Sequence, residues 1–256
     1  MNKSDDTALL LGQLTRIADA LERKHPIDMA PDALPKADAY VWQSDIRQLV
    51  PVAKVNRLDI GLLRGINGQR DDLLSNTMGF IQGFPANNAL LWGARGTGKS
   101  SLVKAVHGTV IARGHDLGLV EIHREDIADL PFLMAFLAQI ERHFIIFSDD
   151  LAFEGGESTY KSLKAALEGG IEGRPDNIVF YATSNRRHLM PRQMMENERS
   201  TAINPSETTE ETVSLSDRFG LWIGFHSIDQ DTYCLLYTSD AADEGLGVDL
   251  GGRRII

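Results

Sequence analysis

The sequence predicts an α/β fold in which a parallel sheet of five strands carries helices on both faces. Short apolar runs near residues 88, 119, 144, 178 and 221 have the length and composition of buried strands. Segments with apolar residues at helical spacing separate these runs, and such alternation is typical of a parallel sheet. Ligands of such a sheet bind beyond the carboxyl ends of its strands. The candidate functional residues are therefore expected at those ends.

The N-terminal part is expected to precede the sheet. Residues 7–24 predict an amphipathic helix, because apolar side chains recur at steps of three and four residues. These side chains are Leu10, Leu14, Ile17 and Leu21. Prolines in residues 25–36 indicate a linker or an extended crossing segment, and residues 40–58 are ambiguous. A turn over residues 62–69 precedes a helix expected over residues 70–82.

Strands and helices are then expected to alternate. Strands are predicted over residues 88–92, 119–122, 144–147, 178–182 and 221–225. Asp126 is a candidate cap of a helix that reaches about Glu141, and residues 158–168 predict another helix, ended by Gly169 and Gly170. Residues 196–214 are polar and predict a long surface loop.

Residues 93–100 read Gly-Ala-Arg-Gly-Thr-Gly-Lys-Ser and fit the P-loop pattern G-x-x-x-x-G-K-[ST]. In this motif glycines allow successive N–H groups to face phosphates, and the following helix directs its positive end at them. Lys99 is expected to reach the β- and γ-phosphates, and Ser100 to bind Mg²⁺. The alternative is a flexible glycine-rich loop with a surface lysine. The strand before the loop and the helix after it favour the P-loop. The expected phosphate-binding residues are Gly93, Ala94, Arg95, Gly96, Thr97, Gly98, Lys99, Ser100 and Ser101.

A second motif ends the strand at residues 144–147, where Ser148 is followed by Asp149 and Asp150. An acid at the tip of a strand beside a P-loop can hold Mg²⁺ through its water shell, which is the role expected for Asp149. Asp150 is then the candidate base that orients or deprotonates the attacking water. Its side chain is one methylene shorter than the Glu common at this position, so slow hydrolysis is an open alternative and Glu154 could substitute. The simplest alternative is that both acids merely cap a strand.

Together these motifs resemble an AAA+ ATPase, and more narrowly a bacterial AAA+ family of unknown function whose members are known only as ATP-binding proteins. The resemblance covers residues 50–233 and rests on residues 63–69, 85–104, 144–154, 174–191 and 214–225. It implies a three-layer P-loop NTPase of the AAA+ type that uses ATP and Mg²⁺. It also implies a small helical lid after the last strand, which the sequence truncates near Tyr233.

The resemblance implies three further roles. Asn185 would be the sensor-1 residue, although Ser184 or Asn185 could simply cap a turn. Arg218 would be an arginine finger that reaches the ATP of the next subunit, with a salt bridge to Asp217 or another acid as the alternative. Arg186 and Arg187 are weaker candidates for that finger. Residues 63–66 would cover the adenine ring, although core packing explains them equally well.

The expected organisation has three parts. Residues 1–49 hold the N-terminal helix and linker, and residues 50–233 form the ATP-binding domain. Residues 234–256 resemble the translation of a sequencing adapter rather than native protein, the alternative being a natural tail rich in Gly and Asp. The single cysteine, Cys234, lies in this tail, so we expect neither a cysteine nucleophile nor a thiolate zinc site.

Composition narrows the function further. The net charge of −10 argues against a broad nucleic-acid-binding face, and no apolar run reaches the length of a membrane span. We therefore expect a cytoplasmic, homo-oligomeric, Mg²⁺-dependent ATPase that acts on a protein or nucleic-acid client. The main alternative is a nucleotide-gated binding or loader module with slow or no hydrolysis. A P-loop kinase is disfavoured, because the candidate sensor and finger stand in AAA+ order.

Overall fold

A seven-stranded sheet forms the centre of the computed structural model, which describes Gln13, residues 34–152, 157–168 and 173–186, Leu189 and residues 218–226. The strand order is β2-β1-β4-β5-β6-β3-β7. All neighbouring strands are parallel except β1 and β2, which pair antiparallel. The strands are β1 (Ala39–Gln43), β2 (Gln48–Pro51), β3 (Ala89–Gly93), β4 (Leu117–Glu121), β5 (His143–Ser148), β6 (Ile178–Ser184) and β7 (Leu221–Phe225).

Five of these strands, β3 to β7, confirm the parallel sheet expected from the sequence, and the strand count of five is corrected to seven. The additional strands come from the ambiguous region. Their hairpin turns through Arg47, whose φ of 48° is left-handed without the Gly or Asn that usually marks such a turn. The sheet therefore begins at Ala39, ahead of the domain boundary expected at residue 50.

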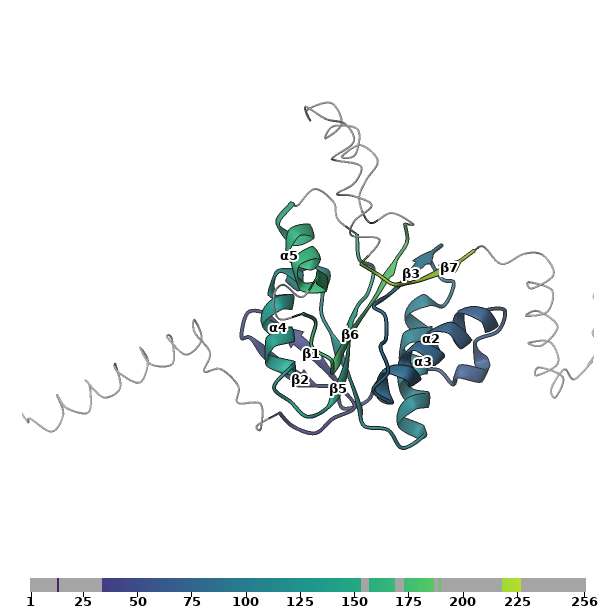
Figure 1. The fold of residues 1–256 in the computed structure, drawn as a ribbon, viewed down its shortest axis with the longest axis horizontal. Coiled ribbons are helices and arrows are strands. Elements are labelled where there is room, and N and C mark those ends of the chain that lie inside the picture. The colour runs from purple at the N-terminus through teal and green to yellow at the C-terminus, as the bar shows by residue number, and fades with distance from the viewer. Residues whose placement is uncertain are drawn as a thin grey trace, which may run out of the picture.

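Helices cover both faces of the sheet (Figure 1). One face carries α2 (Asn67–Ile81) and α3 (Lys99–Ala112), and the other carries α4 (Leu130–Leu137) and α5 (Glu157–Glu168). Short 3₁₀ turns, η2 (Ile60–Leu62) and η3 (Arg124–Asp129), precede α2 and α4. The helices expected over residues 70–82 and 158–168 are confirmed as α2 and α5.

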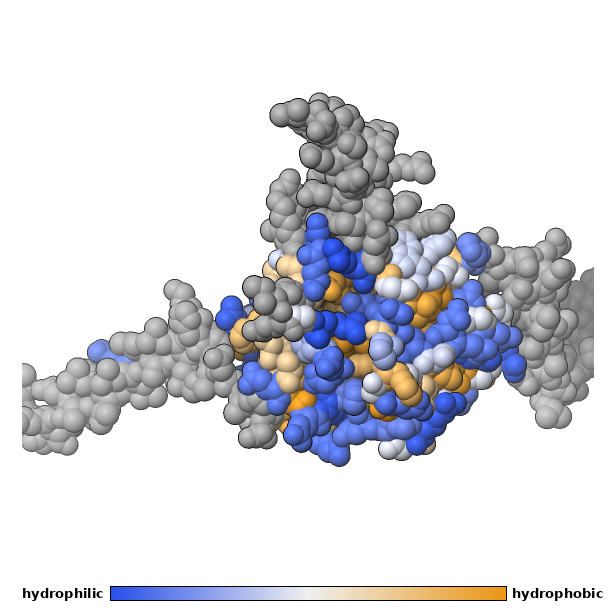
Figure 2. Space-filling view, in the orientation of Figure 1, coloured by the Kyte–Doolittle hydropathy of each residue, from blue (hydrophilic) through white to orange (hydrophobic). Residues whose placement is uncertain are grey.

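The strands divide their side chains between two cores, as their period of two requires. In β5, Phe144 and Ile146 face the α4 and α5 side, whereas Ile145 and Phe147 face the α2 and α3 side. Hydrophilic residues cover most of the described surface on the face shown in Figure 2, with smaller hydrophobic areas between them. The result is the three-layer arrangement that the sequence predicts.

The helix expected from Asp126 to Glu141 is corrected. Residues 124–129 form η3, and α4 starts at Leu130 with Pro131 in its first turn, where a missing N–H costs nothing. Asp126 caps no helix; its carboxylate accepts a hydrogen bond from the Ser44 hydroxyl at 2.5 Å. The side chain of Asp126, the expected helix cap, therefore bonds to the turn between β1 and β2 instead.

Several expectations lie outside the described residues: the helix over residues 7–24 apart from Gln13, the loop over residues 196–214, the start of the lid and the tail from Cys234. Glu154, Arg187 and Asp217 lie there as well. In the described part of the chain, no helix combines the length and apolar character needed to cross a membrane.

Candidate nucleotide-binding site

The P-loop joins β3 to α3, as the motif requires. Gly98 is the N-cap of α3 with a φ of 87°, and the helix begins at Lys99. Gly93 has a φ of 144°, and a Cβ placed there would lie 1.9 Å from the carbonyl oxygen of Phe225 in β7. Glycine is needed at both positions, for backbone conformation at Gly98 and for lack of space at Gly93. The expected start of the helix is confirmed.

Lys99 lies folded into the loop, with only 6% of its surface exposed. Its ammonium group donates to the carbonyl oxygens of Gly93 at 2.9 Å and Ala94 at 2.6 Å, and to Asn185 Oδ1 at 3.2 Å. Burial lowers the pKa of this ammonium, while the nearby charges of Asp149 and Asp150 raise it. The two acids therefore help to keep a buried cation at the centre of the loop.

Asp149 follows β5 and meets the first turn of α3. Its Oδ1 accepts a hydrogen bond from Ser100 Oγ at 2.6 Å, and further bonds from the Thr183 hydroxyl and from the Asp150 N–H at 3.2 Å. Ser100 and Asp149, the expected metal ligands, thus lie in contact. Hydroxyl and carboxylate oxygens are ligands that Mg²⁺ accepts, so the residues present fit this ion.

Asp150 has a left-handed backbone, with a φ of 52°. Its N–H donates to Thr183 Oγ1 at 2.9 Å, and its carboxylate accepts from Asn185 Nδ2 and lies 3.8 Å from the guanidinium of Arg95. Since Asn185 also bonds Lys99, this amide bridges the lysine and the candidate base. The structure thus brings Asp150 and Asn185 together.

The other P-loop residues lie around this centre. Thr97 Oγ1 donates to the Ala94 carbonyl at 2.8 Å and closes the loop. Arg95 is largely exposed, Gly96 is exposed, and Ser101 is half-buried in the first turn of α3.

The turn at residues 63–66 lies beside the P-loop. A Cβ placed on Gly98 would be 4.0 Å from side-chain atoms of both Leu63 and Ile66. These two side chains also pack against the core on the α2 and α3 side. The turn therefore contributes to the core and also lies against the phosphate-binding loop.

Arg218 lies just before β7 and pairs with Glu168 of α5 at 2.9 Å. A salt bridge to Asp217 or another acid is the expected alternative to an arginine finger, and the acid in the structure is Glu168. Ser184 has the capping role considered for it, since its hydroxyl accepts the N–H of Arg186 at 3.2 Å. Asn185, in contrast, faces the site.

Sequence reasoning missed Thr183, which is 1% exposed and hydrogen-bonds both acids. The strand that carries it, β6, pairs with β5 so that Ala182 lies opposite Ser148. This register puts Thr183 next to Asp149, and only knowledge of the pairing could have revealed the contact.

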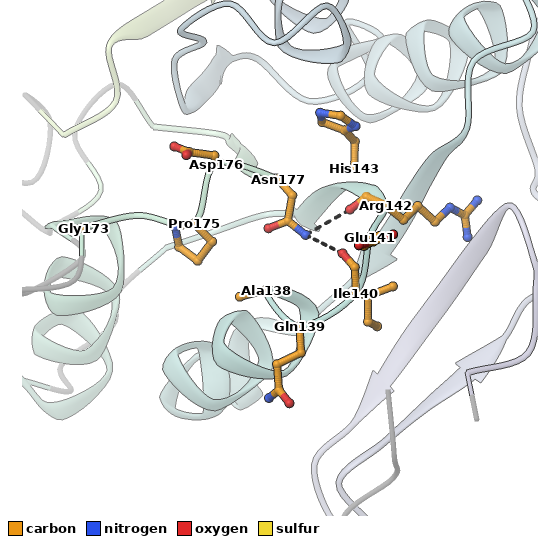
Figure 3. A pocket seen from close by; sticks show the side chains of 10 residues that line it. All are labelled: Ala138, Gln139, Ile140, Glu141, Arg142, His143, Gly173, Pro175, Asp176 and Asn177. Atoms are coloured by element: carbon orange, nitrogen blue, oxygen red, sulfur yellow. Dashed lines mark hydrogen bonds between the residues drawn. The ribbon is translucent and has the colours of Figure 1, made fainter. Parts of the chain in front are cut away.

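A hollow of about 570 Å³ lies at the other ends of β5 and β6, away from the acids. Asn177 is one of the residues that line it, and its Nδ2 donates to the carbonyl oxygens of Ile140 and Arg142 (Figure 3) and of Leu137, at 3.0 Å each. Because these bonds tie the end of α4 to the start of β5, Asn177 has a structural role there.

Solved structures of AAA+ type resemble the chain only distantly. The Thermotoga maritima RuvB Holliday junction branch migration motor has a TM-score of 0.43 and 16% identity, and the match covers 70% of this chain and 51% of that one. The Aeropyrum pernix Orc1 protein in complex with DNA has a TM-score of 0.48 and 15% identity, covering 70% and 50%. The chain thus spans about half the length of these proteins.

The fold class is nevertheless confirmed by the architecture itself. A P-loop joins strand β3 to helix α3, the strand that ends in acids, β5, is separated from β3 by β6, and helices cover both faces of a mostly parallel sheet. This is the α/β arrangement of a P-loop NTPase, with three layers as expected.

No curated protein matches the chain in sequence. A family described as a protein of unknown function, DUF815, matches residues 35–251. The matched range starts close to the first strand and extends into the adapter-like tail, whose interpretation stays a prediction. Since the match spans most of the sequence, the chain belongs to the DUF815 family.

Proposed function

We propose that the chain binds ATP with Mg²⁺ and hydrolyses it as an AAA+ ATPase. The observation that carries the proposal is the 2.6 Å hydrogen bond between Ser100 of α3 and Asp149 after β5. It joins the two halves expected of an ATPase site, which lie 49 residues apart in the sequence. A glycine-rich loop with a surface lysine, or a pair of strand-capping acids, does not require this contact.

The loop and Lys99 would bind the phosphates. The loop residues offer N–H groups at the positive end of α3, which favours an anion. The ammonium of Lys99 now bonds two loop carbonyls, and β- and γ-phosphate oxygens would replace them as partners. Leu63 and Ile66, whose side chains lie beside Gly98 of the loop, would contact the adenine ring.

Ser100 and Asp149 would hold Mg²⁺, which when bound neutralises phosphate charge and orients the terminal phosphate. The carboxylate of Asp150 would accept a proton from the attacking water. Asn185 would orient that water or the γ-phosphate, because its amide lies between Lys99 and Asp150. Glu154 remains a substitute base in this proposal.

A second candidate is a nucleotide-gated binding or loader module that hydrolyses slowly or not at all. Asp150 favours it, because its short carboxylate is engaged by Asn185 and lies 3.8 Å from Arg95. Both groups compete with an attacking water for this carboxylate.

Assembly into a homo-oligomer would complete the site. In this chain Arg218 pairs with Glu168 and is 45% exposed, so it could exchange this partner for the ATP of a neighbouring subunit. The protein would then act in the cytoplasm and transmit ATP-driven motion to a protein or nucleic-acid client.

The test is steady-state ATP hydrolysis with Mg²⁺ over a range of protein concentrations, for the wild type, Arg218→Ala and Arg113→Ala. Arg113 is an exposed control at the end of α3. We expect specific activity to rise with concentration in the wild type and the control, and to stay low for Arg218→Ala. Bound ATP with flat, near-zero turnover would select the binding module. Absence of Mg²⁺-dependent ATP binding would refute both.

A further inference from the structure

Thr183 contacts three consecutive residues of the acidic segment. Its hydroxyl donates to the carboxylate of Asp149 and accepts the N–H of Asp150 at 2.9 Å. Its carbonyl oxygen accepts the N–H of Leu151 at 2.7 Å. One hydroxyl can donate and accept at the same time, so Thr183 links both acids through a single atom.

The contact determines which oxygen of Asp149 is left for a metal. Within the described part of the chain, Oδ1 accepts three hydrogen bonds, from Ser100, Thr183 and the Asp150 N–H. Oδ2 takes part in none of the hydrogen bonds there, so it is the oxygen open to a water of a bound ion. If Ser100 turns to the ion, the other two donors still hold the carboxylate in place.

The same contact shapes the backbone at Asp150. A left-handed φ in a residue other than glycine costs on the order of 1 kcal/mol or more, although Asp tolerates it better than most. The bonds from the N–H groups of Asp150 and Leu151 to Thr183 hold the chain in this conformation. The conformation in turn places the carboxylate of Asp150 against Asn185.

We propose that Thr183 is a positioning residue that fixes the metal-side carboxylate of Asp149 and the catalytic carboxylate of Asp150 relative to each other. The inference rests on the proposed ATPase function. Threonine suits the task because its branched side chain is stiff at χ1 in a strand, which gives the buried hydroxyl one direction. Serine keeps the hydroxyl, whereas valine keeps the shape and removes it.

The test compares Thr183→Val and Thr183→Ser with the wild type and with Thr77→Val. Thr77 is a matched control, since its hydroxyl is equally buried and hydrogen-bonded but lies in α2, where it contacts Leu73 and Tyr181. Binding of a fluorescent ATP analogue is measured in EDTA and in Mg²⁺, and turnover is measured against Mg²⁺ concentration. Circular dichroism verifies that each variant is folded.

We expect Thr183→Val to bind the analogue as well as the wild type in EDTA, because the contacts of Lys99 are intact. In Mg²⁺ it should lose the extra affinity, need more Mg²⁺ for half-maximal turnover, and turn over about tenfold to a hundredfold more slowly. That range corresponds to the loss of a hydrogen bond to a charged group. Thr183→Ser should stay within about threefold of the wild type, since it retains this bond.

Two outcomes overturn the inference while leaving the proposed function in place. One is Mg²⁺-dependent binding and turnover in Thr183→Val equal to that of the wild type. The other is a Thr183→Ser variant that turns over about tenfold or more slowly than the wild type, and this second criterion stands even if the valine variant does not fold. Failure of the wild type to bind ATP would instead refute the function on which the inference rests.

Discussion

Replacing Lys99 by Met separates the binding role of this residue from its role in the fold. Methionine keeps an unbranched stem that reaches as far as Cε and removes the ammonium group. The loss breaks three hydrogen bonds, to the carbonyl oxygens of Gly93 and Ala94 and to Asn185. We expect the variant to fold and to lose ATP binding.

The size of the effect follows from these contacts. Ala94 keeps a partner in Thr97, so the groups that lose a donor are the Gly93 carbonyl and Asn185 Oδ1, at about 1–3 kcal/mol for a buried acceptor. Removal of a buried charge, whose cost appears as the lowered pKa of Lys99, offsets part of this loss. Without ligand, the free energy of unfolding should therefore change by less than about 2 kcal/mol.

The ATP-induced rise in Tm is the measurement that tests whether Lys99 is needed for binding. At an ATP concentration of 100 times Kd, binding stabilises the wild type by about 2.7 kcal/mol, which corresponds to roughly 5–11 °C in Tm for a chain of this size. Lys99→Met should show no shift with Mg²⁺ and ATP. Lys104→Met, on the same helix, should shift like the wild type. A full ATP-induced shift in Lys99→Met would refute the assignment of the P-loop.

Three further predictions concern the fold and the chemistry. Gly93→Ala should lower the free energy of unfolding by at least about 3 kcal/mol in urea titrations, because its Cβ would lie 1.9 Å from the carbonyl oxygen of Phe225. Gly114→Ala, whose Cβ would meet open space at a left-handed φ of 88°, should lose only about 1 kcal/mol. Burial lowers the pKa of His107 from 6.5 to about 4, so its neutral form is favoured in the fold and its contribution is lost as pH falls from 6.5 towards 4. This loss amounts to about 3 kcal/mol. In His107→Gln, the free energy of unfolding should therefore fall by about 3 kcal/mol less between pH 6.5 and pH 4 than in the wild type. An unchanged pH dependence would contradict the burial of a neutral His107. Asp150→Asn should reduce turnover at least about a hundredfold while Mg²⁺-dependent ATP binding persists; undiminished turnover would show that another residue is the base.

Local sequence patterns were sufficient for the parts of the site that lie within one motif. The glycines, Lys99 and Ser100 follow from one loop pattern, and Asp149 and Asp150 follow from a hydrophobic strand that ends in acids. These signals depend on residues adjacent in the chain. The parallel strands were predictable for the same reason, since each is a continuous apolar run.

Features that depend on pairing could not be read from the sequence. The β1–β2 hairpin has no Gly or Asn at its left-handed position, which is Arg47. The position of Asp126 predicts a helix cap, but its carboxylate accepts a hydrogen bond from Ser44, which lies 82 residues away in the sequence. Nor does any pattern indicate that the hydroxyl of Thr183 bonds both acids, because this contact exists only through the register of β5 and β6.

The order of the strands explains why the end of β6 has to be polar. The strand before the P-loop, β3, and the acidic strand, β5, are not neighbours, because β6 lies between them. Adjacent strands lie about 4.8 Å apart, so β3 and β5 are separated by roughly 10 Å. Asn185 crosses this gap by bonding both Lys99 and Asp150. A large apolar side chain in its place would fill the gap but leave the lysine and the acid without this shared partner. The signature of the site therefore includes the residues that end the middle strand, in addition to the two motifs on either side of it.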